Sequence, residues 1–378
     1  MKETNRHCEE SEGRRSNLGF KSKIASSKNR TRNDSIIALF LTLFSFSGCT
    51  VWQPLRKPPQ NNLPGTYQGY YDYSSPDLAA KIVREKVTKH YILRTLEFPL
   101  TLPPELQVKD LDAYRLKNEE LFKTDQKTAN DLALRYTVRI DYYVPKNLKP
   151  GQKRPAILIS PILGGNMVVD HFARYYAGRG FVAAIVYRKR LFWQDERTDM
   201  QQFEDYLRTS IIRLREAVDW LSAQPEVDAG RIGSFGVSYG AILHTVLAAV
   251  EPRIRYHVLA MPAGPISEVI VHCPDKAVTK LIKHAEEHYG WTIGQIEKDM
   301  AATVKTDPVL MAPYVPREKI EVYVSLFDRV VGAGRSFRLW KALGKPKLRI
   351  LPFGHYGGIM VFPYLETQSY LALKKHLK

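Results

Sequence analysis

The sequence predicts an α/β fold with a mostly parallel central sheet and helices on both faces. Short apolar runs alternate along the chain with longer stretches of helical periodicity, which is the pattern of a parallel sheet. Residues 155–160 are almost continuously apolar, as expected for a strand that is buried on both faces. The chain has 378 residues, enough to bury a full core without disulfides or a structural metal.

The individual elements follow from the spacing of apolar residues. Residues 134–144 alternate apolar and polar side chains, which predicts a half-buried strand. Residues 201–223 repeat apolar side chains at helical spacing. Further strands are predicted at residues 91–100, 155–160, 181–187, 231–235, 256–261, 320–327 and 347–352, and further helices at residues 76–87, 168–177, 239–250 and 367–377.

A five-residue motif, Gly236-Val237-Ser238-Tyr239-Gly240, stands where an apolar strand passes into an apolar helix. In this context G-x-S-x-G forms a sharp turn that exposes the serine hydroxyl at the carboxyl edge of the sheet. The alternative is a glycine-rich turn with a helix-capping serine. We interpret Ser238 as a nucleophile because strand, motif and helix occur together.

A nucleophilic serine needs a base, and the base needs an acid that orients it. Asp328 and His355 each follow a predicted strand, so both belong to the edge that carries Ser238. We therefore predict Ser238, Asp328 and His355 as the catalytic residues. Asp307 is the alternative acid.

A developing oxyanion needs two backbone N–H donors. We expect one from Tyr239, which directly follows the nucleophile. The loop of residues 161–166 follows a strand and contains two glycines, which allow close approach of the backbone to a substrate. It predicts Leu163 as the second donor, with Gly164 as the alternative. A plain strand-to-helix turn would leave both without this role.

Residues 130–378 resemble the serine hydrolases of the α/β-hydrolase superfamily. The resemblance rests on Arg231-Ile-Gly-Ser-Phe-Gly-Val-Ser-Tyr-Gly240, Leu339-Trp-Lys-Ala-Leu-Gly-Lys-Pro346 and Phe353-Gly-His-Tyr-Gly357. It is strongest to the branch of dienelactone hydrolases, prolyl oligopeptidases and acetyl-xylan esterases. It implies the chain order Ser, Asp, His. Dienelactone hydrolases use Cys where this chain has Ser238, so the resemblance implies a serine esterase instead.

Residues 263–318 are long for a connection between two strands, and we interpret them as a helical lid over Ser238. A surface insertion is the alternative. The aromatic and methionine side chains in this segment suggest a small-molecule or acylated substrate with an apolar portion. We expect no cofactor.

His284-Ala-Glu-Glu-His288 matches the H-x-x-E-H pattern of some zinc peptidases. Charged neighbours such as Lys280 and Lys283 favour a solvated helix face instead. We therefore predict no metal site. Besides an esterase, the sequence leaves open a peptidase or thioesterase of the same fold, and an inactive protein that binds the cell envelope.

The N-terminal part predicts a lipoprotein signal peptide. Residues 1–34 hold nine basic and five acidic residues, and the uncharged apolar run 36–46 precedes Ser47-Gly48-Cys49. This junction resembles the bacterial lipoprotein box, which implies cleavage after residue 48 and a lipid on Cys49. Thr50 implies sorting to the outer membrane, facing the periplasm. Translation starting downstream of residues 1–34 is an alternative.

The net charge of +17 suggests a polyanionic partner at first. Residues 1–34 carry +4 of it, so +13 remains after cleavage at residue 48. No nucleic-acid motif is present in that remainder, so we expect no nucleic acid and interpret the charge as favouring an anionic membrane. The predicted organisation is a leader (1–48), a tether (49–65) and a hydrolase domain (66–378), whose first part is an N-terminal extension (66–130).

Overall fold

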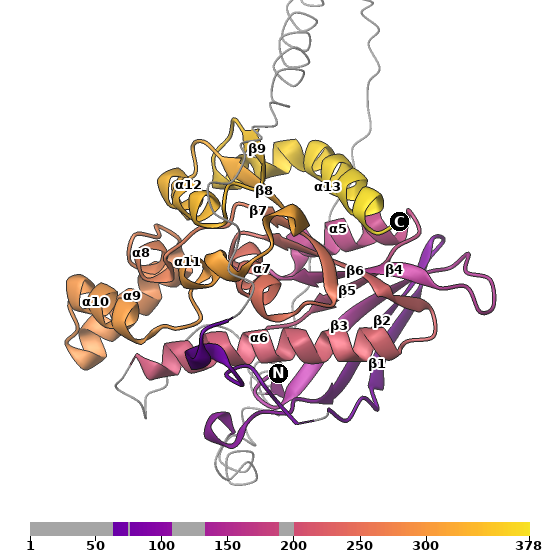
Figure 1. Ribbon diagram of the computed structural model, residues 1–378, viewed down its shortest axis with the longest axis horizontal. Coiled ribbons are helices and arrows are strands. Elements are labelled where there is room, and N and C mark those ends of the chain that lie inside the picture. Colours follow the sequence, from indigo (N-terminus) through magenta and orange to yellow (C-terminus); the bar gives the residue numbers. More distant parts are fainter. Residues whose placement is uncertain (1–62, 75, 108–132, 189–199) are drawn as a thin grey trace, which may run out of the picture. The chain divides into compact units, whose positions relative to one another are not determined.

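The computed structural model describes residues 63–74, 76–107, 133–188 and 200–378 (Figure 1). These residues belong to the second of two compact units, Ser47–Lys378. The first unit, Met1–Phe46, lies outside the described residues, as do the predicted signal peptide, Cys49, nearly all of the tether and residues 108–130 of the predicted extension.

One sheet organises the described residues, with strands in the order β1-β2-β3-β5-β4-β6-β7-β8-β9. The first three pairs in this order, β1 with β2, β2 with β3 and β3 with β5, are antiparallel, and from β5 to β9 every pair is parallel. This confirms the predicted α/β class with a mostly parallel sheet. The strands are β1 (Lys81–Val87), β2 (Tyr91–Pro99), β3 (Thr137–Pro145), β4 (Arg154–Ser160), β5 (Val182–Val186), β6 (Val227–Val237), β7 (Ile254–Ala260), β8 (Ile320–Ser325) and β9 (Lys347–Leu351).

Helices cover both faces of the sheet because side chains of a strand alternate between faces. In β4, Ala156 and Leu158 join the core beneath α6 and α7, whereas Ile157 and Ile159 join the core beneath α5 and α13. Figure 1 shows α6 and α13 on opposite sides of the sheet. The helices are α5 (Met167–Ala177), α6 (Gln201–Ala223), α7 (Tyr239–Val250), α8 (Ile266–Val271), α9 (Lys276–Tyr289), α10 (Ile293–Thr303), α11 (Pro308–Met311), α12 (Ala333–Ala342) and α13 (Phe362–His376).

Short 3-10 helices occupy several of the connections. They are η1 (Gly65–Tyr67), η2 (Pro104–Leu106), η3 (Ala312–Tyr314), η4 (Arg317–Lys319) and η5 (His355–Val361). No helix in the described ranges is both long and apolar enough to cross a membrane.

The predicted helix at residues 76–87 is wrong. Its second half is strand β1, which pairs antiparallel with β2 across a short hairpin. The β-branched residues Ile82, Val83 and Val87 favour this extended state. The predicted strand 134–144 also starts too early, because a turn in which Tyr136 N–H donates to the Ala133 carbonyl precedes β3.

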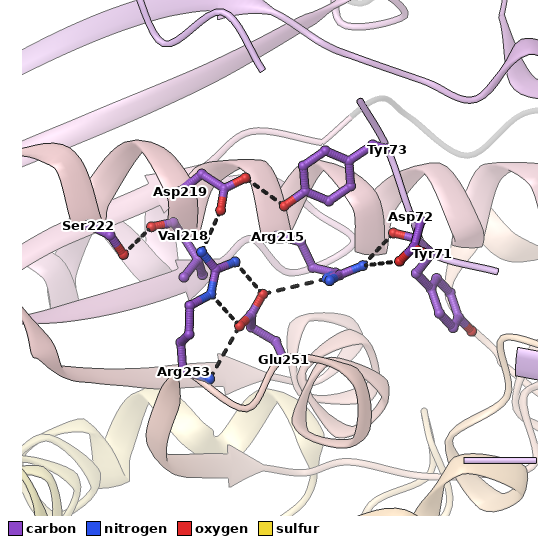
Figure 2. A network of polar contacts seen from close by, with 9 residues as sticks. All are labelled: Tyr71, Asp72, Tyr73, Arg215, Val218, Asp219, Ser222, Glu251 and Arg253. Atoms are coloured by element: carbon purple, nitrogen blue, oxygen red, sulfur yellow. Dashed lines mark hydrogen bonds and ion pairs between the residues drawn. The ribbon is translucent and has the colours of Figure 1, made fainter. Parts of the chain in front are cut away.

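The tyrosine-rich segment before β1 lies against α6 (Figure 2). The Tyr73 hydroxyl donates to Asp219 at 2.6 Å, and Arg215 donates to the Tyr71 carbonyl at 2.5 Å. Arg215 also lies 3.5 Å from the buried carboxylate of Glu251 at the end of α7. These contacts join the N-terminal segment to the two helices that stand beside the nucleophile motif.

Candidate active site

Ser238 occupies the turn between β6 and α7. Its backbone has φ 54° and ψ −121°, a conformation that costs a non-glycine residue about 1–3 kcal/mol. The turn is held in place because the Ser238 N–H donates to the Ala260 carbonyl of β7 at 2.8 Å. Ser238 is 8% exposed. The structure thus forms the sharp strand-to-helix turn that the motif predicts.

Both glycines of the motif are required by close backbone contacts. A Cβ atom at Gly236 would lie 2.6 Å from the Gly240 carbonyl oxygen. A Cβ atom at Gly240 would lie 2.5 Å from the carbonyl oxygen of Ser160, at the end of β4. Side chains at these positions would therefore separate α7 from the sheet and displace Ser238.

His355 and Asp328 lie together at the carboxyl edge of the sheet. The Nδ1 atom of His355 is 2.7 Å from Oδ2 of Asp328. The other carboxylate oxygen of Asp328 accepts the backbone N–H groups of Val330 and Val331 at 2.9 and 3.0 Å. Asp328 is 5% exposed, so a buried carboxylate with a fixed orientation faces the imidazole.

Asp307, the alternative acid, has a structural position. It caps α11 by accepting the N–H groups of Val309 and Leu310, and its second oxygen accepts the Ile266 N–H at 2.6 Å. Burial raises the pKa of this carboxyl group, and the backbone donors oppose that effect. Because both oxygens are bound to backbone N–H groups, Asp307 is a poor candidate for orienting His355.

Ser238 and His355 line one cavity of about 100 Å³. Most of its wall is apolar and includes the loop after β4, helix α8 and the loop after β8. Val269, Ile270 and Val330 are examples. A larger hollow of about 450 Å³ lies between α8, α10 and α11 but contains neither Ser238 nor His355.

The predicted oxyanion residues border the same cavity. Tyr239 is the first residue of α7, where the N–H groups of the first turn have no acceptor within the helix. Leu163 and Gly164 lie in the turn closed by the Gly165 N–H and the Ile162 carbonyl at 3.1 Å. Ser238, His355 and the three predicted oxyanion residues therefore line one cavity, and Asp328 is hydrogen-bonded to His355. The predicted lipidation residue, Cys49, lies outside the described residues.

Sequence reasoning missed several residues of the cavity wall. Tyr356 lines the cavity and donates its hydroxyl to Asp275, the N-cap of α9, at 2.8 Å. Burial, together with this hydrogen bond, raises the pKa of Tyr356 to about 12. Cys273 also lines the cavity, and burial raises the pKa of its thiol. The position of Tyr356 directly after His355 was the available signal.

His244, His284 and His288 do not line the cavity that contains Ser238. His284 and His288 stack on each other with ring centroids 4.0 Å apart on α9. Within the described residues, no group of three histidine, cysteine, aspartate or glutamate side chains could hold a metal ion. His244 is fully buried, and its Nε2 atom lies 2.7 Å from the Ser160 hydroxyl.

Two protein-family models match the chain. One describes X-Pro dipeptidyl-peptidases of the S15 family and matches residues 114–280. The other describes the C-terminal region of BAAT and acyl-CoA thioester hydrolases and matches residues 214–370. The second model spans Ser238, Asp328 and His355.

Curated relatives match over shorter regions. An uncharacterized protein of Mycobacterium tuberculosis strain H37Rv is 25% identical over 152 residues, 38% of this chain and 32% of the relative. A polyketide transferase of Penicillium crustosum is 24% identical over 192 residues, 49% of this chain and 59% of the relative. The chain thus spans about a third to three fifths of the length of these relatives.

Two solved structures share the fold over most of the chain. Acetyl xylan esterase 1 from Thermoanaerobacterium sp. JW/SL YS485 has a TM-score of 0.56 and 16% identity, covering 85% of this chain and 99% of that one. The acetyl xylan esterase from Paenibacillus sp. R4 has a TM-score of 0.56 and 14% identity, covering 85% and 97%.

The sheet order, the strand-to-helix turn and the two structural matches define the α/β-hydrolase fold. The chain belongs to the α/β-hydrolase superfamily.

Proposed function

We propose that the protein is a serine hydrolase that cleaves the ester bond of a small acylated molecule through Ser238, His355 and Asp328. One observation carries the proposal. Ser238, held at φ 54°, shares a cavity with His355, and the Nδ1 atom of His355 lies 2.7 Å from the buried carboxylate of Asp328. These are the positions of nucleophile, base and orienting acid in a triad.

The proposed reaction has two steps. The Ser238 hydroxyl oxygen attacks the ester carbonyl while Nε2 of His355 takes its proton, and the same proton then goes to the departing alcohol. Water next attacks the acyl-enzyme, gives a proton to His355 and releases the carboxylic acid as Ser238 recovers its proton. Asp328 keeps Nδ1 protonated and stabilises the imidazolium that forms in each step.

The size and lining of the cavity support a short acyl group. A volume of about 100 Å³ is well below the roughly 300–1,000 Å³ of typical small-molecule sites. Val269, Ile270 and Val330 present apolar surface, which favours a hydrocarbon over a charged group. We therefore expect acetyl to butyryl esters to be turned over faster than long-chain esters.

A thioesterase or peptidase is the second candidate, because the family models that match are named for a thioester hydrolase and for X-Pro dipeptidyl-peptidases. The same three residues would serve either reaction. Parallel assays with nitrophenyl esters, acyl-CoA thioesters and X-Pro nitroanilides distinguish the candidates by the ratio of their kcat/KM values.

The direct test combines turnover and covalent labelling. We expect wild-type protein to hydrolyse nitrophenyl acetate and to incorporate one fluorophosphonate per chain, and Ser238→Ala to do neither. Turnover that persists unchanged in Ser238→Ala would contradict the proposed mechanism. A folded wild-type protein that neither turns over any of the substrates nor reacts with the fluorophosphonate would instead support the inactive envelope-binding alternative.

We also propose that Cys49 carries a lipid that anchors the protein in a bacterial outer membrane, facing the periplasm. The apolar run 36–46 that ends at Ser47-Gly48-Cys49 supports this proposal. Labelled palmitate should be incorporated into the wild-type chain and not into Cys49→Ser, and the membrane fraction should contain only the former. Equal fractionation of both would argue against the anchor.

A further inference from the structure

Arg188, two residues after β5, binds the loop that carries the predicted oxyanion donor Leu163 and its alternative, Gly164. Its Nη2 atom donates to the carbonyl of Ile162 at 3.0 Å and also to the carbonyl of Leu163. Its Nε atom makes a longer contact of 3.3 Å with the Ile162 carbonyl. One guanidinium group therefore holds two consecutive carbonyl groups of the loop after β4.

The geometry of the peptide bond gives this contact a consequence for the cavity. In a trans peptide the C=O and the N–H of one unit point in opposite directions. The carbonyl of Ile162 shares its peptide unit with the Leu163 N–H, and the carbonyl of Leu163 shares its unit with the Gly164 N–H. Because both carbonyls face Arg188, both N–H groups point away from it, and Leu163 and Gly164 line the cavity that contains Ser238.

Arg188 also contacts the other predicted oxyanion residue. Its guanidinium carbon lies 5.4 Å from the centroid of the Tyr239 ring, within the range of a cation–π interaction. Tyr239 begins α7 directly after the nucleophile. The same side chain thus links the loop after β4 to the first turn of α7, the two segments that would supply the oxyanion donors.

A planar guanidinium group suits this task better than an ammonium group. It offers several N–H donors in a fixed fork and can stack on an aromatic ring, whereas lysine offers one flexible point of charge. A lysine at position 188 could reach one carbonyl group but could not hold two carbonyls and the Tyr239 ring in one arrangement.

We infer that Arg188 is a positioning residue for the oxyanion hole: it fixes the Ile162 and Leu163 carbonyls so that the Leu163 and Gly164 N–H groups face the reacting carbonyl. The inference rests on the proposed ester hydrolysis at Ser238. It assigns to Arg188 an effect on the transition state that acts through the loop, without contact with the substrate.

The test compares Arg188→Ala and Arg188→Lys with Arg179→Ala. Arg179 is the matched control because it also donates to a carbonyl, that of Tyr175 at 3.3 Å, and stacks on the ring of the same tyrosine. It lies in the turn between α5 and β5, at the opposite end of β5 from Arg188. Active sites are counted in each preparation by exhaustive fluorophosphonate labelling, so that misfolded protein does not enter kcat.

We expect kcat of Arg188→Ala on nitrophenyl acetate to fall about 10- to 100-fold, somewhat less than the loss of an oxyanion donor. KM should stay within about threefold, and the Ki of a boronic acid inhibitor should rise in proportion to the loss of kcat/KM, because its tetrahedral adduct uses the same donors. Arg188→Lys should fall between Ala and wild type, and Arg179→Ala should equal wild type. Added guanidinium ion should restore turnover in Arg188→Ala and leave Arg179→Ala unchanged.

Unchanged kcat in Arg188→Ala, or a loss confined to KM, would overturn the inference while leaving the serine mechanism intact. A lower count of active sites with normal kcat per site would reduce Arg188 to a folding role and would overturn it as well. Wild-type protein that neither turns over esters nor reacts at Ser238 would instead refute the proposed function, and the inference with it.

Discussion

The structure contains serine–histidine pairs in two settings, and the contrast between them supports the choice of Ser238 as the proposed nucleophile. Ser238 and His355 border a cavity at the carboxyl edge of the sheet, and His355 is bound to Asp328. Ser160 and His244 form a 2.7 Å hydrogen bond inside the core, where both are buried. Burial lowers the pKa of His244 to about 3, so its imidazole remains neutral under ordinary conditions.

A second serine–histidine pair is buried in the same way. The hydroxyl of Ser234 on β6 lies 2.8 Å from Nδ1 of His257 on β7, and both side chains are nearly inaccessible to solvent. Burial lowers the pKa of His257 well below its ordinary value. A short Ser–His contact therefore does not by itself mark a site that a substrate can reach. The site at the edge has instead a cavity, a strained serine and an imidazole held by a carboxylate.

The largest expected effect separates the two kinds of serine. Ser238→Ala should lower kcat on nitrophenyl esters by about 10⁴-fold or more, because no other group can form the acyl-enzyme. Ser234→Ala should leave kcat per active site within about threefold and should lower the free energy of unfolding by about 1–3 kcal/mol, since His257 loses a buried partner. Steady-state kinetics and urea unfolding measure the two quantities. Equal kinetic losses would remove the distinction.

The two buried aspartates give the next contrast. Asp328→Asn should lower kcat by about 10³- to 10⁴-fold, because an amide no longer fixes the imidazole tautomer. The Asp328→Asn, Ser238→Ala double variant should be little worse than Ser238→Ala alone.

Asp307→Asn serves as the matched substitution. It should lower stability by about 2 kcal/mol, because charge-assisted bonds to the N–H groups of Ile266 and Val309 weaken, and kcat should change less than threefold. A kinetic loss in Asp307→Asn as large as that in Asp328→Asn would indicate that Asp307 is the acid that orients His355.

Gly240 belongs to the motif around Ser238 and also packs against Ser160 of the buried pair, because its Cα faces the Ser160 carbonyl. Gly240→Ala should cost about 1–3 kcal/mol of stability by overpacking and should also reduce kcat, since α7 must move away from β4. Gly334→Ala in α12 is the control, because a Cβ there meets nothing within 4 Å. It should be neutral or slightly stabilising in thermal unfolding. A fully active and stable Gly240→Ala protein would contradict the steric account.

The smallest effect concerns stability and pH. His244 has a folded-state pKa of about 3 and an ordinary value of 6.5, so unfolding takes up a proton between these values and stability falls as pH decreases through this window. The contribution is about 1.4 kcal/mol between pH 7.5 and 5.5. Urea unfolding at both pH values should show a shallower decrease for His244→Gln than for wild type. An identical decrease in the two proteins would contradict the buried neutral state.

The local motifs were predictable from the sequence because each consists of consecutive residues. The strand and helix around Ser238 have continuous apolar patterns, and the long helix α6 ends at the predicted residues. The prediction of a helix at residues 76–87 was wrong because the few apolar residues of this segment fit a helix as well as a strand. Pairing with β2, which the segment alone does not reveal, decides between them.

The support of the site could not be predicted because it depends on residues far apart in the chain. Arg188 contacts Ile162 and Leu163 through backbone carbonyls, which carry no sequence signal. The hydrogen bond of Tyr356 to Asp275 and the contact of Tyr73 with Asp219 join segments more than 80 residues apart. Such contacts follow from the order of strands in the sheet, and the sequence leaves that order open.

The proposal that Ser238 is the nucleophile is tested most directly by locating a covalent label. Wild-type protein is treated with a fluorophosphonate and digested, and the modified peptide is sequenced by mass spectrometry. If Ser238 is the nucleophile, we expect one label, on Ser238, with loss of ester turnover in the same proportion as the label is incorporated. Complete labelling of another residue, or full turnover by protein labelled at Ser238, would contradict it.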